Sequence, residues 1–166
     1  MQDSHKMALT LKLAQKALRN GELPIAAIIF DEDHVIAKSH TSEIKDHRFL
    51  VHAELKALFV MDRLGFSIAE RRSLCLFTTL EPCVMCFGAM MSSFIGEVIY
   101  SLSAPDDGAT KLLNFDHFSG DLVQRQLPKI GGGVCKEAAK ELWQAYLQVE
   151  KRKYLRAFAE TVLASN

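Results

Sequence analysis

The sequence lacks any run of apolar residues long enough to cross a membrane, and it has no segment with the pattern of a signal peptide. It also lacks an excess of either charge, since 20 Lys and Arg residues balance 20 Asp and Glu residues. No overall field therefore draws the chain to nucleic acid or to a membrane, and a polyanionic partner has to meet a local basic patch. Four cysteines in 166 residues are too few for a disulfide framework. These absences predict a protein of the reducing cytoplasm with no membrane partner.

Internal repeats and linker-like segments are absent as well, so we expect one domain over residues 1–166, with 49% hydrophobic residues to fill its core. Helices are predicted at about 4–20, with Ser4 as the N-cap, and at 52–64, 83–93 and 134–162, and strands at 25–30, 35–39, 74–80 and 97–102. A helical turn is predicted within 112–118, and the glycine run 131–133 indicates a turn before the last helix. The alternation of strands and helices implies an α/β/α sandwich around a mixed sheet.

Two cysteines follow the third predicted strand. Pro82 suits the first turn of a helix, where its missing N–H would have no partner, so Cys83 and Cys86 would open a helix. The unpaired N–H groups and the positive pole of the dipole at that end favour thiolates. The spacing alone leaves two alternatives open, a metal site and a thioredoxin-like redox pair.

A second motif, His52-Ala53-Glu54, opens another helical pattern. Side chains in a first turn lean back over the N-terminus, so His52 and Glu54 can both reach a point in front of it. If two such helices converge, His52, Cys83 and Cys86 give three protein ligands and leave one position open, which is typical of catalytic zinc. Glu54 would then carry a proton from the zinc-bound water to a leaving amine.

The pair of motifs, His52-x-Glu54 and Pro82-Cys83-x-x-Cys86, resembles the signature of the cytidine and deoxycytidylate deaminase superfamily. Thr79 to Cys86 with the following Gly88-Ala89 is most similar to the bacterial tRNA adenosine deaminase branch. The resemblance implies a three-layer α/β/α sandwich with a five-stranded mixed sheet and one Zn²⁺ per chain. It implies a homodimer and hydrolysis at C6 of adenine or C4 of cytosine, with ammonia leaving. By the same resemblance, substrate contacts fall on Thr41, Ala53, Leu80 and Glu81.

Two departures from the branch concern the substrate. The position that generally carries a base-reading asparagine is Thr41, and no asparagine occurs between Asn20 and Asn114. After the fourth predicted strand, where the branch has an aspartate and a lysine, this chain has Asp106 and Asp107. A basic cluster in the last predicted helix favours contact with nucleic acid, and the alternative is an amphipathic helix with its cations in solvent; the cluster comprises Lys151, Arg152, Lys153 and Arg156.

The sequence therefore predicts a zinc-dependent hydrolytic deaminase whose leading substrate is an adenosine in tRNA, converted to inosine. A free-base or nucleoside deaminase of the guanine or cytosine type is the first alternative, because it would need no basic helix. A non-catalytic binding partner that keeps zinc for stability is the second. Glu54 argues against the second alternative, since a structural site has no use for an uncoordinated carboxylate beside its metal.

Overall fold

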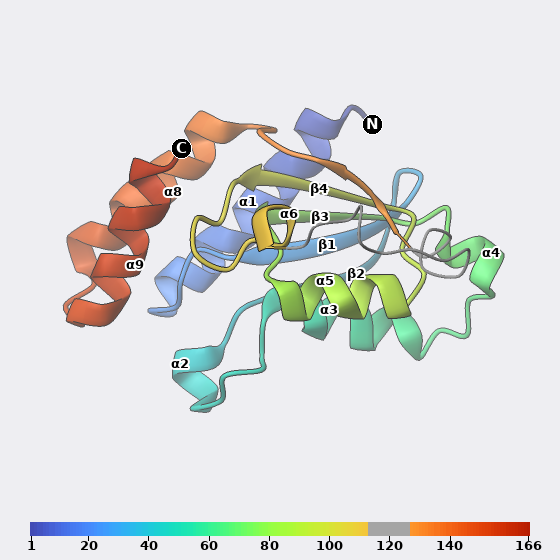
Figure 1. The fold of residues 1–166 in the computed structure, drawn as a ribbon, viewed down its shortest axis with the longest axis horizontal. Coiled ribbons are helices and arrows are strands. Elements are labelled where there is room, and N and C mark those ends of the chain that lie inside the picture. The colour runs from blue at the N-terminus through green and yellow to red at the C-terminus, as the bar shows by residue number, and fades with distance from the viewer. Residues whose placement is uncertain (113–126) are drawn as a thin grey trace.

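Five strands form one mixed sheet in the order β2-β1-β3-β4-β5 in the computed structural model, which describes residues 1–112 and 127–166 (Figure 1). β1 pairs antiparallel with β2 and β3, whereas β3, β4 and β5 run parallel. The sheet confirms the predicted fold class. The strands are β1 (Ala26–Asp31), β2 (His34–His40), β3 (Cys75–Leu80), β4 (Glu97–Leu102) and β5 (Lys129–Gly131).

Helices cover both faces of this sheet (Figure 1). One layer contains α1 (Asp3–Arg19), α8 (Lys136–Val149) and α9 (Lys153–Ala164), and the other contains α3 (Ala53–Asp62) and α5 (Val84–Ser92). Three short helices lie in the connections: α2 (Glu43–Asp46), α4 (Ile68–Arg71) and α6 (Ala109–Leu112). Among the described residues no helix is both long and apolar enough to span a bilayer.

The strand period of two divides the core between these layers. On β3, Phe77 packs with Met7 and Trp143 in the core under α1 and α8. Its neighbour Leu76 points the other way and packs with Met61 in the core under α3 and α5. The continuous apolar run of the third predicted strand is therefore explained by burial on both faces.

The single helix predicted over about 134–162 is wrong, because the chain forms two helices, α8 and α9. The backbone is extended at Glu150, the C-cap of α8. The Glu150 carboxylate accepts hydrogen bonds from the backbone N–H and the guanidinium of Arg152. Arg156 donates to the carbonyl oxygens of Leu147 and Glu150, so it satisfies acceptors that the helix end leaves unpaired.

Smaller differences concern element ends. The N-cap of α1 is Gln2 rather than Ser4. The glycine run predicted as a turn begins inside β5, and a Cβ on Gly132 would lie 2.4 Å from the Tyr100 ring, so a larger residue there would force that ring to move. The helical turn predicted over 112–118 lies outside the described residues apart from residue 112, which ends α6.

Candidate active site

Two helix N-termini bring the predicted metal ligands together. His52 is the N-cap of α3 and Cys83 is the N-cap of α5, which puts Cys86 in the first turn of α5. His52 Nδ1 lies 3.7 Å from Cys83 Sγ and 3.5 Å from Cys86 Sγ, and the three ligand atoms lie within 4.8 Å of one another. Tetrahedral zinc, with Zn–N near 2.0 Å and Zn–S near 2.3 Å, separates such ligand atoms by about 3.5–3.6 Å. The donor set and its spacing therefore fit one Zn²⁺.

The charges at this cluster also suit a cation. The pKa of the Cys83 thiol is lowered to about 4, first by a hydrogen bond with the Cys86 thiol and then by one with His52. The hydrogen bond with Cys83, followed by that with Glu43, raises the pKa of His52 to about 10. The pKa of Cys86 is raised, because it shares its proton with Cys83 and is buried. One thiolate is thus already favoured at neutral pH, as a thiolate ligand requires.

Glu54 lies beside the cluster without joining it. Its carboxylate is buried, accepts a hydrogen bond of 2.9 Å from the Thr78 hydroxyl, and lies 3.7 Å from Cys86 Sγ. Burial raises the pKa of Glu54 above its ordinary value. A buried carboxylate with a raised pKa, oriented by the Thr78 hydroxyl, is suited to accept a proton and return it.

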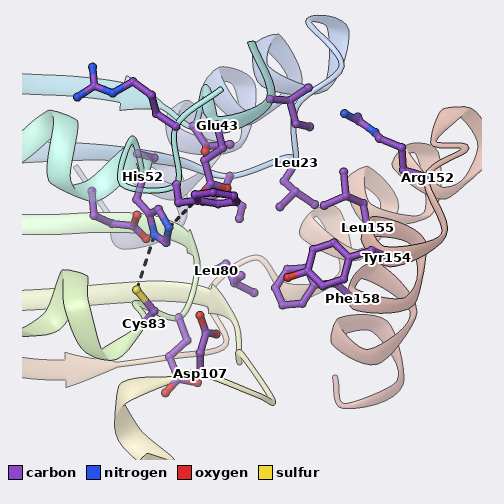
Figure 2. Close-up of a pocket in the computed structure, with 18 of the residues that line it drawn as sticks. Leu23, Glu43, His52, Leu80, Cys83, Asp107, Arg152, Tyr154, Leu155 and Phe158 are labelled. Atoms are coloured by element: carbon purple, nitrogen blue, oxygen red, sulfur yellow. Dashed lines mark hydrogen bonds and ion pairs between the residues drawn. The ribbon is translucent and has the colours of Figure 1, made fainter. Parts of the chain in front are cut away.

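A second carboxylate, Glu43, contacts the other side of the histidine ring. Its Oε1 lies 3.0 Å from His52 Nε2, whereas both sulfur atoms lie near Nδ1, and Figure 2 shows His52 between Glu43 and Cys83. Glu43 begins α2, whose first N–H groups, those of Ile44 and Lys45, donate to the buried carboxylate of Glu22. Sequence reasoning missed Glu43, because it lies between the strand predicted at 35–39 and the helix predicted at 52–64, where the sequence predicts no helix or strand.

A cavity of about 600 Å³ extends from these residues to α9. Figure 2 shows His52 and Cys83 at one side of it and Tyr154, Leu155 and Phe158 projecting from α9 at the other. All four residues predicted to contact the substrate line this cavity, together with Glu54: Thr41, Ala53, Leu80 and Glu81. Their contact with a substrate stays a prediction.

Thr41 and Glu81 are held at the cavity wall in different ways. Thr41 is buried, and its backbone N–H donates to the Ile25 carbonyl, which fixes it at the cavity wall. The Glu81 carboxylate instead accepts hydrogen bonds from the backbone of Ala104 and from both the backbone and the hydroxyl of Thr110. Glu81 therefore holds the segment after β4 against the wall of the cavity. In that segment Asp107 lines the cavity, and burial raises the pKa of its carboxyl.

The basic cluster is divided by the break between α8 and α9. Arg152 lines the cavity, but its guanidinium is paired with Glu150, and Arg156 closes the end of α8. The side chains of Lys151 and Lys153 are exposed. Two of the four residues predicted to contact nucleic acid, Arg152 and Arg156, therefore also stabilise the break between α8 and α9.

The ligand cluster, the cavity and Glu54 together define the class of enzyme. Three zinc-type ligands at the end of a cavity, with a buried carboxylate beside them and outside the ligand set, define a zinc-dependent deaminase, a hydrolase that acts on C–N bonds. The chain belongs to the cytidine and deoxycytidylate deaminase family, because residues 1–102 match the model of its zinc-binding region.

Known proteins agree with this assignment. The chain is 30% identical to the tRNA-specific adenosine deaminase of Bacillus subtilis (strain 168) over 149 residues, which cover 85% of this chain and 91% of that protein. It is 33% identical to the tRNA-specific adenosine deaminase of Streptococcus pyogenes serotype M18, over 92% of this chain and 94% of that one. A solved structure from a study of A-to-I editing by tRNA:A34 deaminases superposes with a TM-score of 0.70 and 28% identity, over 84% of this chain and 99% of that chain.

Proposed function

We propose that the protein deaminates an adenosine to inosine in the anticodon loop of a tRNA. The observation that carries the proposal is the extent of the cavity, which runs from His52 and Glu54 to Tyr154 and Phe158 on α9, so that a base beside Glu54 leaves room for its neighbours. A free base would fill only the end beside His52 and Glu54. The named activity of the similar proteins from Bacillus subtilis and Streptococcus pyogenes supports the same substrate.

The proposal assigns His52, Cys83 and Cys86 as the zinc ligands and Glu54 as the general acid and base. When bound, the zinc ion supplies a Lewis acid that lowers the pKa of a coordinated water to about 7. Glu54 takes a proton from the attacking water on one carboxylate oxygen while Thr78 holds the other, and it delivers that proton to the departing amine. The Thr41 hydroxyl would hydrogen-bond the base, which Ala53 and Leu80 flank.

The proposal also takes residues 1–166 as one domain that works as a homodimer in the cytoplasm, where tRNA is available. The local basic patch expected for a polyanionic substrate would be Lys151 and Lys153, with Arg152 facing the cavity. A mass measurement in solution by light scattering tests the dimer.

The substrate is tested with the zinc-loaded protein and two sets of compounds. We expect inosine and ammonia from an anticodon stem-loop RNA with a wobble adenosine, and no ammonia from free adenine, guanine, cytosine or their nucleosides. The same stem-loop with a wobble guanosine controls for ammonia from other sources. Release from one free compound and none from the stem-loop would instead identify a free-base or nucleoside deaminase.

We further propose that Glu43 holds the His52 ring in the orientation that zinc requires. A histidine that binds a metal through one nitrogen usually donates its other N–H to a carboxylate or carbonyl, and loss of that partner typically costs 10–100-fold in metal affinity or activity. The 3.0 Å contact between Glu43 Oε1 and His52 Nε2 has this arrangement. Glu43 is therefore a positioning residue that acts through His52.

The expected result for Glu43→Ala is a fall in zinc affinity of about 10- to 100-fold, measured by competition with a chromogenic chelator. Glu43→Gln keeps a hydrogen-bond acceptor and should retain more of the affinity than alanine. Asp46→Ala, on the same short helix but hydrogen-bonded to Ser42, is the matched control. Equal zinc affinity in Glu43→Ala and the control would contradict the assignment.

A further inference from the structure

The two most exposed large apolar side chains among the described residues lie at the same cavity. Phe49 is 90% exposed and Tyr154 is 80% exposed, and both line the cavity that contains His52 and Glu54. They are far apart in the sequence, since Phe49 precedes α3 and Tyr154 is in the first turn of α9. Exposed aromatic rings that gather at a functional cavity indicate a surface that another molecule covers.

Both rings are carried by segments with defined supports. The loop before α3 is held where the Arg48 N–H donates to the Glu43 carbonyl, one residue before Phe49. The start of α9 is fixed by the hydrogen bonds between Arg152 and Glu150, and Figure 2 shows Tyr154 facing the cavity from that helix. The segments that carry the two rings are therefore fixed, while the rings themselves are left exposed to solvent.

Each ring directly follows a basic residue. Arg48 precedes Phe49, Lys153 precedes Tyr154, and all four side chains are exposed. An aromatic face beside a cation suits a nucleotide, because the base stacks on the ring while the phosphate meets the charge. A zero net charge makes such local contacts necessary, since no overall field attracts RNA.

We infer that Phe49 and Tyr154 form a stacking rim that binds unpaired nucleotides flanking the base being deaminated. This inference rests on the proposed function and adds how the RNA is held. The target base enters the end of the cavity beside Glu54, and its neighbours leave the loop stack and lie on the two rings. Stacking of this kind tolerates sequence changes, because every base has an aromatic face.

The test compares Phe49→Ala and Tyr154→Ala with wild type in steady-state deamination of the wobble-adenosine stem-loop. Each change should raise KM by about 5- to 150-fold, the range measured when a base loses its stacking partner, with a smaller change in kcat and one zinc per chain. Phe49→Trp and Tyr154→Phe keep a ring and should restore KM. Phe59→Ala, which removes a ring that is 66% exposed on α3 and outside the cavity, is the control.

A spectroscopic measurement separates stacking from a general disturbance. With 2-aminopurine next to the target adenosine, the bound RNA should fluoresce more strongly on Phe49→Ala or Tyr154→Ala than on wild type, because the quenching partner is gone. Unchanged KM and unchanged fluorescence in both alanine variants, with wild type active on the stem-loop, would overturn the rim and leave the proposed function intact. A wild type that does not deaminate the stem-loop would overturn both.

Discussion

Glu54→Gln should keep one zinc ion per chain and lose about 10²–10⁴ of kcat, the usual contribution of general acid–base catalysis. Glutamine preserves the size of the side chain and a carbonyl that can accept from the Thr78 hydroxyl, so the cavity should keep its shape. It cannot accept and return a proton. Substrate binding should change little, because the residues at the far end of the cavity are untouched.

The measurement is stem-loop deamination together with zinc content by atomic emission. Asp107→Asn is the matched control, because it also converts a carboxylate that lines the cavity to an amide. The control distinguishes loss of a proton carrier from loss of negative charge in the cavity. A Glu54→Gln enzyme with full zinc and wild-type kcat would show that another group carries the proton.

The first four strands and the ligand set could be predicted because their signals are local, whereas β5 has only three residues and no periodic pattern, so only the resemblance implied a fifth strand. Apolar runs with β-branched residues gave the fourth strand its observed bounds, 97–102. Pro82 and the His52-x-Glu54 motif placed two helix starts within a residue of those observed, at Ala53 and Val84. Convergence of those starts came from the family resemblance, because no periodic pattern reports which helix ends meet.

The features that sequence reasoning missed depend on contacts between distant residues. Residues 151–153 have good helix propensity, so the sequence predicts that the helix continues through them. The reason that α8 ends is visible only in the structure, where Arg152 pairs with Glu150 and Arg156 caps the helix end. Glu43 reaches His52 because the buried Glu22 carboxylate holds α2 in place. Neither contact has a sequence pattern of its own.

Cys86→Ser should lose the zinc ion, all measurable deamination and part of the thermal stability. Serine is nearly the size of cysteine, but its hydroxyl stays protonated at neutral pH and is a poor zinc ligand beside His52 and Cys83. Cys86 is fully buried in α5, and zinc bound there would link the starts of α3 and α5. Ligand linkage gives about 2.7 kcal/mol of stabilisation at a free zinc concentration of 100 Kd. For a chain of this length that corresponds to about 5–11 °C in Tm.

Chelation separates the metal's contribution from that of the side chain. A strong chelator should lower the Tm of wild type by the amount that Cys86→Ser loses, and it should leave the Tm of Cys86→Ser unchanged, because the variant has no zinc to release. Cys135→Ser, a thiol at the start of α8 that donates to the Ser4 carbonyl, should behave as wild type in zinc content and chelator response. A Cys86→Ser protein that retains one zinc per chain and still responds to the chelator would remove Cys86 from the ligand set, and the remaining protein ligands would have to be sought among the other residues lining the cavity.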